Sequence, residues 1–290
     1  MAEITARNPV LVLIWSFGLF LFMHLGQYVG ALLAVRRSGQ TFDAIMSGKY
    51  EDHDTLLMKG IGTVVAGIPL IWIAVALLWR RPAAWMQLPF QGLALVAGLG
   101  MGILVPVLIA GMLRILGYAA IQPSQSILAW SKKIPWLSGI ALLAVFTGVA
   151  EEIVFRAMAA REIAWVMGWP LAVLIAGTYF GVVHLIGQLK TLTLTKALAV
   201  LVSSILVSFL LIAMYVRSGS IWMPIGFHAA WNFSLVGILG LPMNGNVSEV
   251  SVFQTTFSGP AWLTGGTMGM EASGAALLAY VIVGLLFVLF

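Results

Sequence analysis

The sequence predicts an all-α fold, a polytopic transmembrane helix bundle with about eight membrane-spanning helices. Of its 290 residues, 61% are hydrophobic and 9% are charged, whereas a soluble globular domain has about 25% charged residues. The apolar residues gather in stretches of about 20, the length that an α-helix needs to cross the hydrocarbon core of a bilayer. The predicted spans are residues 9–35, 60–79, 90–117, 137–168, 169–187, 197–216, 221–240 and 274–290.

The lengths and the flanks of these stretches justify the individual spans. The first apolar stretch exceeds the 7–15 residues usual for a signal peptide, so we expect it to be retained as a helix. The fourth is longer than a bilayer requires, and its C-terminal end is expected to project into water. Basic residues lie mostly in short connectors, where they anchor helix ends at lipid headgroups. They are Arg36, Arg37, Arg80, Arg81, Lys132, Lys133, Lys190 and Lys196.

The chain is predicted to form a single integral membrane domain, residues 1–290. It shows no strong internal repeat of the kind found in many transporters. The connector at residues 241–273 is rich in Gly, Ser and Thr and contains no Lys or Arg. We therefore expect an extramembrane, turn-rich loop over one mouth of the bundle.

Composition narrows the classes of partner and chemistry. The net charge is +5, but no basic patch interleaved with aromatic residues is present, so we do not expect nucleic-acid binding. Cysteine is absent, which excludes disulfides and a thiolate nucleophile. The expected surroundings are the lipid bilayer itself.

Glu151 and Glu152 are adjacent within the fourth predicted span. An ionised carboxylate in the bilayer costs several kcal/mol unless it is paired or hydrated, so such residues usually have a function. Arg156 follows Glu152 by four residues, which places both on one helical face in the favourable order of charges. The sequence thus predicts a local counter-ion for Glu152.

Two further pairs of residues have the same spacing within later spans. Phe180 precedes His184 by four residues, and His228 precedes Asn232 by four, so each pair lies on one helical face. A single membrane histidine is often only an interhelical hydrogen-bonding group. Together with the two carboxylates, however, these residues supply a base, a proton shuttle and hydrogen-bond donors, the groups needed to attack a carbonyl with water.

These segments resemble the EExxxR, FxxxH and HxxxN motifs of the CAAX protease and bacteriocin-processing family, also called Abi. All three occur in the family's order, within residues 137–240, which would be the catalytic core helices. The resemblance implies an intramembrane endopeptidase of about eight helices. Its implied catalytic residues are Glu151 as general base, His184 holding the water, Glu152 paired with Arg156, and His228 with Asn232 as the oxyanion hole. Phe180 is the implied substrate-binding residue, and packing of its ring between helices is the structural alternative.

We expect no required cofactor, although zinc is an alternative because this family has been described both with and without a metal. If a metal were bound, the ligands to test would be Glu151, His184 and His228, since catalytic zinc commonly takes three protein ligands and a water. The sequence contains no HExxH motif. We favour the metal-independent interpretation.

The expected substrate is a membrane-associated peptide or membrane-protein segment, and the expected location is a bacterial inner (cytoplasmic) membrane. Two other classes of function remain open. A non-catalytic scaffold or bacteriocin-immunity protein would bind membrane peptides without cutting them. An ion-coupled transporter would also keep Glu, Arg and His inside a helix bundle.

Overall fold

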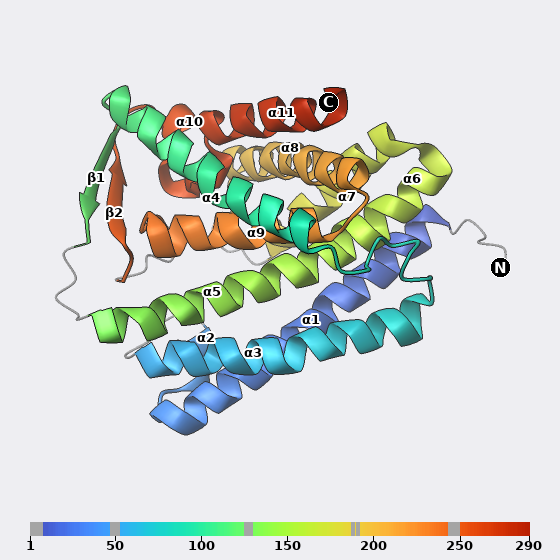
Figure 1. Ribbon diagram of the computed structural model, residues 1–290, viewed down its shortest axis with the longest axis horizontal. Coiled ribbons are helices and arrows are strands. Elements are labelled where there is room, and N and C mark those ends of the chain that lie inside the picture. Colours follow the sequence, from blue (N-terminus) through green and yellow to red (C-terminus); the bar gives the residue numbers. More distant parts are fainter. Residues whose placement is uncertain (1–7, 47–52, 125–129, 187–188, 190–191, 243–249) are drawn as a thin grey trace.

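The computed structural model describes residues 8–46, 53–124, 130–186, 189, 192–242 and 250–290. Its long helices lie roughly along one direction, with the first and last helices at opposite edges of the bundle (Figure 1). The predicted all-α membrane bundle is confirmed. The helices are α1 (Pro9–Ser38), α2 (Phe42–Met46), α3 (His53–Ala74), α4 (Gly92–Ile115), α5 (Trp130–Glu152), α6 (Arg161–Met167), α7 (Trp169–Ile186), α8 (Leu194–Ser218), α9 (Trp222–Phe233), α10 (Ala261–Thr264) and α11 (Gly274–Leu289).

Each of the eight predicted spans coincides with helical structure. Within the described ranges, six helices are long and apolar enough to cross a membrane. The other two predicted spans correspond to α11, which has 16 residues, and to α9 with its continuation. The number of eight spans therefore stays a prediction.

Three helices continue directly into π-helical segments. They are η1 (Val75–Trp79) after α3, η2 (Ile153–Ala160) after α5, and η4 (Ser234–Ile238) after α9. Through η2, α5 continues without a break into α6. π-Helical turns are rare and frequently mark functional sites.

The long α5–α6 helix differs from its prediction at its N-terminal end. It begins at Trp130 rather than at residue 137 and runs to Met167, because a helix can extend past its apolar run into polar residues. Near its C-terminal end Glu162 is fully buried, and it accepts a hydrogen bond of 2.8 Å from Arg81. This part of the helix is therefore packed against the segment that follows η1, whereas Trp165, Val166 and Met167 after it are exposed. That this end projects into water stays a prediction.

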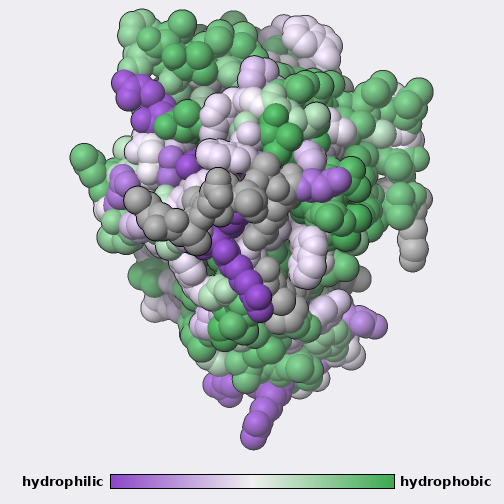
Figure 2. Space-filling model, turned by 90° about the vertical axis from the view of Figure 1, so that its right-hand side faces the viewer, coloured by the Kyte–Doolittle hydropathy of each residue, from purple (hydrophilic) through white to green (hydrophobic). Residues whose placement is uncertain are grey.

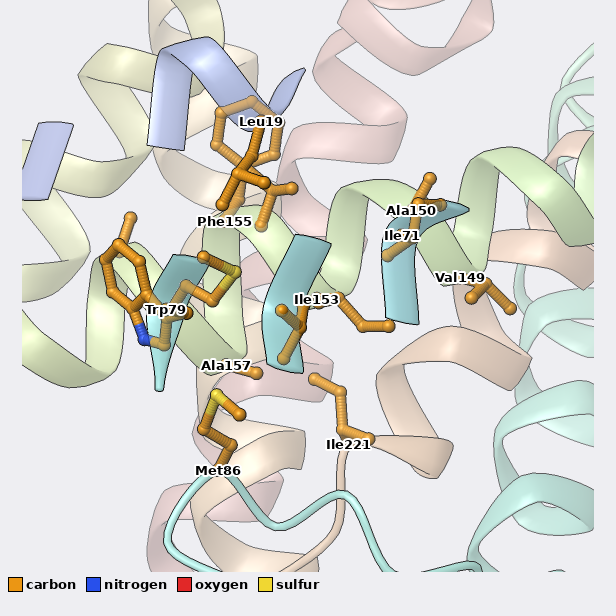
Figure 3. Close-up of a cluster of buried hydrophobic side chains, with 14 of the residues drawn as sticks. Leu19, Ile71, Trp79, Met86, Val149, Ala150, Ile153, Phe155, Ala157 and Ile221 are labelled. Atoms are coloured by element: carbon orange, nitrogen blue, oxygen red, sulfur yellow. The ribbon is translucent and has the colours of Figure 1, made fainter. Parts of the chain in front are cut away.

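The centre of the bundle is the α5–η2 helix, which contacts α3, α9, α1, α7 and α8. Its side chains Ile153 and Phe155 lie in a buried apolar cluster with Leu19 of α1, Trp79 of η1 and Ile221 before α9 (Figure 3). Burying this face fixes the rotation of the helix. As a result, the adjacent glutamates at the end of α5 point toward α7, α8 and α9.

Close helix contacts rely on glycine. A Cβ on Gly26 of α1 would lie 2.4 Å from the Cα of Gly67 in α3, and one on Gly98 of α4 would lie 2.1 Å from the Met223 carbonyl oxygen of α9. Without a hydrophobic driving force in lipid, membrane helices associate through such small residues. These contacts hold α9 against α4 and so fix its position beside α5.

The connector at residues 241–273 is structured where it is described. Strand β2 (Phe253–Phe257) pairs antiparallel with β1 (Ala119–Pro123), which follows α4. Beyond β2 come α10 and two 3-10 turns, η5 (Gly266–Met268) and η6 (Met270–Ala272). The β1–β2 ribbon stands at the end of the bundle opposite to the start of α1 and the end of α11 (Figure 1). The extramembrane position of the connector stays a prediction.

The other end of the bundle carries the starts of α1 and α7 and the ends of α8 and α11. Figure 2 views this end and shows hydrophilic residues scattered among hydrophobic ones. Arg80 closes η1 and Arg217 lies in the last turn of α8, and both are exposed. Such residues suit the boundary between lipid and water.

Candidate active site

Two adjacent carboxylates stand where α5 changes into η2. Glu152 is fully buried and Glu151 is 9% exposed. The two side chains leave the helix about 100° apart, so they face different neighbours. Glu152 points into a network of buried polar groups, and Glu151 faces two histidines.

Glu152 accepts two hydrogen bonds through the same oxygen. Arg156 Nη1 lies 2.9 Å from Glu152 Oε1, the pairing that the four-residue spacing predicts. His228 Nδ1 of α9 lies 2.7 Å from the same oxygen. Glu152 Oε2 is buried and has no hydrogen-bond partner within the described part of the chain. The carboxylate thus joins α5 to α9 through charged hydrogen bonds, which are about twice as strong as neutral ones.

Arg156 is 1% exposed and contacts two further helices. Its Nη2 donates a hydrogen bond of 3.2 Å to Ser208 Oγ of α8. Its guanidinium lies over the Phe180 ring of α7, 4.6 Å from the ring centroid, a favourable cation–π arrangement. From η2, one buried arginine therefore links α5 with α7 and α8.

His184 is oriented by its own helix. Its Nδ1 lies 2.8 Å from the Phe180 carbonyl oxygen, and its ring centroid is 4.3 Å from that of Phe180. A carbonyl oxygen only accepts hydrogen bonds, so Nδ1 carries the proton. In the neutral ring Nε2 is then the acceptor, and it faces Glu151. Phe180 thus fixes both the tautomer and the position of the histidine.

Glu151 lies between the two histidines. Its Oε2 is 3.9 Å from His184 Nε2 and 3.8 Å from His228 Nε2. These distances are too long for direct hydrogen bonds. They are short enough for a water oxygen to bridge Glu151 and either histidine. A water in such a position would have a carboxylate and an imidazole nitrogen beside it.

Asn232 lies one turn after His228 on α9 and is 7% exposed. Among the residues that the structure describes, no hydrogen bond links its amide to Glu151, to Glu152 or to either histidine. Of the seven residues singled out in the sequence, six are thus joined by contacts. Asn232 lies one helical turn from His228, and within the described ranges no hydrogen bond joins it to the other six.

Two neighbours of this cluster were not predicted from the sequence. Ser208 resembles any other small polar residue of an apolar span, and only its contact with Arg156 distinguishes it. Glu271, in η6, interacts electrostatically with His184, His228 and Glu151, and burial raises the pKa of its carboxyl. The sequence signal for Glu271 is an acid just before the last span, in a connector that has no basic residue.

The zinc alternative named Glu151, His184 and His228 as the ligands. Within the described ranges, no three His, Cys, Asp or Glu side chains are grouped so as to hold a metal ion. Metal independence stays a prediction, which a chelator can test.

The fold and this cluster define a class: an integral membrane protein with a carboxylate–histidine centre buried among its helices. Comparison with protein families is more specific. Residues 133–234 match the family described as type II CAAX prenyl endopeptidase Rce1-like. This segment contains all three motifs, and its match supports the resemblance to the CAAX protease and bacteriocin-processing family. No curated protein matches the chain.

The family is one of membrane proteases. The match over residues 133–234 therefore supports a protease whose class of substrate is a membrane-associated protein or peptide.

Proposed function

We propose that this protein is an intramembrane endopeptidase in which Glu151 and His184 activate a water molecule to hydrolyse a peptide bond. The observation that carries the proposal is the position of Glu151 Oε2, less than 4 Å from the Nε2 atoms of both His184 and His228. A general base must reach the proton that it removes, directly or through one water. Both histidines present the atom that can bond such a water.

In the first step the water loses a proton to the Glu151 carboxylate while its oxygen attacks the carbonyl carbon of the substrate. His184 Nε2 accepts a hydrogen bond from the second O–H of the water, which stays on the attacking oxygen, and so holds that oxygen in line. A carbon–oxygen bond forms, and the electron pair of the carbonyl moves onto its oxygen. Since both side chains are already oriented by the bundle, little reorganisation is needed.

The tetrahedral oxyanion requires hydrogen-bond donors. His228 donates through Nε2 only when its ring carries both protons, because Nδ1–H is directed at Glu152. The resulting imidazolium lies 2.7 Å from the Glu152 carboxylate, which favours that charge. The amide of Asn232 is the proposed second donor.

In the second step the carbon–nitrogen bond breaks, and the proton held by Glu151 passes to the leaving amine. Glu151 thereby returns to its ionised form. Glu152, Arg156 and Ser208 do not exchange protons with the substrate in this scheme. They act as positioning residues that hold His228 and Phe180.

We further propose that the enzyme requires no metal and acts in a bacterial inner membrane. The substrate is a peptide or protein segment presented from the lipid. Any lipid attached to the substrate would have to be accommodated between the helices.

The test is kinetic, with the purified protein in liposomes and membrane-anchored peptides as substrates. We expect Glu151→Gln to abolish cleavage and His184→Gln to lower kcat by about 100-fold or more. The matched control is His24→Gln, because His24 of α1 also bonds the carbonyl four residues earlier, Phe20, at 3.0 Å, but lies outside the cluster. Wild-type cleavage by the Glu151 variant would refute the assignment of the base.

A further inference from the structure

A groove lies between α4 and α11, at the end of the bundle where α8 ends and α9 begins. Its volume is about 480 Å³, within the range of about 300–1,000 Å³ that is usual for ligand pockets. None of its lining residues belongs to the proposed active site. Its lining includes Arg217 and the apolar residues Met101, Met223, Val283, Leu286 and Phe287.

The two walls of the groove are held by different helices. A Cβ on Gly102 of α4 would lie 2.3 Å from the Phe227 carbonyl oxygen of α9, and one on Gly284 of α11 would lie 2.4 Å from the Phe209 ring of α8. Toward the β1–β2 ribbon, α4 and α11 share the apolar cluster that contains Leu113. Toward the other end the two helices diverge (Figure 1). The groove lies where they have diverged.

The groove faces lipid and has an adaptable apolar lining. The α11 helix contains no charged residue, and its Leu286 and Phe290 are 51% and 81% exposed. Met101 and Met223 contribute unbranched side chains, which adapt to partners of irregular shape. From Val283 to Phe290 the helix rises by about 10 Å, at about 1.5 Å per residue. That length is about a third of the hydrocarbon core of a bilayer, so the groove suits part of an acyl chain.

The residues around the groove indicate that it begins at the level of the lipid headgroups. Trp222, which precedes Met223, donates a hydrogen bond of 3.0 Å from Nε1 to the Leu88 carbonyl. Its ring centroid is 4.9 Å from that of Phe90, which is 68% exposed. Aromatic residues gather at the boundary between lipid and water. The phosphate of a lipid would therefore lie at the depth of Arg217, in the last turn of α8.

Arg217 brings a positive charge to the groove. Its Nη2 donates a hydrogen bond to the Phe290 carbonyl, so the guanidinium reaches from the end of α8 to the end of α11. A guanidinium has five N–H donors, and no carboxylate of the described residues forms an ion pair with Arg217. Phosphate oxygens match the geometry of the remaining donors.

A purely structural role for Arg217 is the alternative. A basic side chain in the last turn of a helix interacts favourably with the helix dipole, and the bond to Phe290 joins two helix ends. Arg80 has similar features, since it is exposed, closes η1 and donates a hydrogen bond of 2.9 Å to the Leu77 carbonyl. Of these two arginines, however, Arg217 is the one that lines the groove. Comparing them separates lipid binding from a general effect of charge.

We propose that the groove between α4 and α11 is a binding site for one anionic phospholipid. An acyl chain lies along α11, and the phosphate accepts hydrogen bonds from Arg217. Because lipid tails are as apolar as the groove itself, the chain alone gives little selectivity. The charge of Arg217 therefore selects an anionic headgroup over a zwitterionic one.

The experiment is native mass spectrometry of the full chain in neutral detergent micelles, titrated with anionic phosphatidylglycerol or with zwitterionic phosphatidylcholine. We expect the first phosphatidylglycerol to bind the wild-type protein about 10-fold more tightly than the first phosphatidylcholine. Arg217→Gln should weaken phosphatidylglycerol binding by about 10- to 100-fold, the range for hydrogen bonds to charged groups, and Arg217→Lys should keep most of the affinity. Arg80→Gln should leave both affinities unchanged. Leu286→Trp, which fills the groove, should weaken the binding of both lipids.

Three outcomes would overturn the proposal. The first is equal affinity of the wild-type protein for the two lipids, and the second is an equal loss of phosphatidylglycerol binding in Arg217→Gln and Arg80→Gln. The third is a dimer in the same spectra that Leu286→Trp abolishes and phosphatidylglycerol leaves intact, which would assign the groove to a second copy of the chain. Should Arg217→Gln fail to fold, Leu286→Trp at its half-exposed position keeps the test, because unchanged phosphatidylglycerol binding there would also overturn the site.

Discussion

Replacing Arg156 by methionine tests the buried network that supports the site. Arg156 and Glu152 are 1% and 0% exposed, and the variant removes both the ion pair of 2.9 Å and the hydrogen bond of 3.2 Å to Ser208. Removing one partner of a buried pair typically costs about 3–5 kcal/mol, because the other charge is left without compensation. The lost contact with the Phe180 ring adds to this cost. We therefore expect Arg156→Met to lower the free energy of unfolding by about 3–5 kcal/mol.

The assay is reversible unfolding in mixed micelles, performed as a double-mutant cycle with Glu152→Gln. The double variant leaves no unpaired charge, since Gln still offers a carbonyl oxygen to His228 Nδ1–H. It should therefore be less destabilised than the sum of the two single variants, by a coupling energy of about 0.5–3 kcal/mol. A coupling energy near zero, or an Arg156→Met variant as stable as wild type, would refute the argument.

Three further predictions concern the chemistry of the site. Asn232→Ala should lower kcat by about 100- to 1000-fold with little change in substrate binding, as for loss of an oxyanion donor; weaker binding at unchanged kcat would remove Asn232 from that role. A chelator should leave cleavage intact in liposomes, and activity that is lost and then restored by zinc would contradict metal independence. Because burial raises the pKa of Glu271 above its ordinary value of 4.5, its contribution to stability is fully present below that pH and is lost as the pH rises through the raised pKa. The melting temperature of Glu271→Gln minus that of the wild-type protein should therefore be larger at pH 8 than at pH 4. An equal difference at both pH values would contradict this.

The membrane spans were predictable because lipid imposes them. In a bilayer every backbone polar group must be bonded within the segment, so an apolar stretch of about 20 residues reports a helix directly. The ends of the helices were less predictable. The helix that carries Glu151 begins at Trp130, seven residues before its apolar stretch, because polar residues at a helix end lose nothing by remaining helical.

The π-helical segments were not predicted. Both η2 and η4 follow closely after residues of the proposed site, Glu152 and Asn232. Their extra residue per turn depends on how side chains pack against neighbouring helices, and hydropathy carries no information on that packing. The β1–β2 pairing was missed for a similar reason, since each strand has only five residues and its partner is more than 120 residues away.

Contacts between site residues of one helix were predictable from the sequence, and contacts between helices were not. Glu152 with Arg156, and Phe180 with His184, lie four residues apart, so helical geometry alone brings them together. The bond from His228 to Glu152 joins residues 76 positions apart. It was not predictable from spacing, although the three motifs indicate a common site. Glu271 has no motif, and only the folded connector places it near the histidines.

The position of Phe180 combines the two interpretations given to it by the sequence. Its ring packs in the interior, 7% exposed, as the structural alternative supposes. It also lies under Arg156 and against the His184 ring. These contacts favour the interpretation that Phe180 holds the His184 ring in place. Direct contact of Phe180 with the substrate stays a prediction.

The central claim is that Glu151 is the base of a peptide hydrolysis. The most direct test is mass spectrometry of new peptide termini in membranes that contain the wild-type protein or the Glu151→Gln variant at equal expression. We predict a set of termini that is present with the wild-type protein and absent with the variant. Identical sets of termini, in membranes where a peptide cleaved by the purified wild-type protein is present, would contradict the claim.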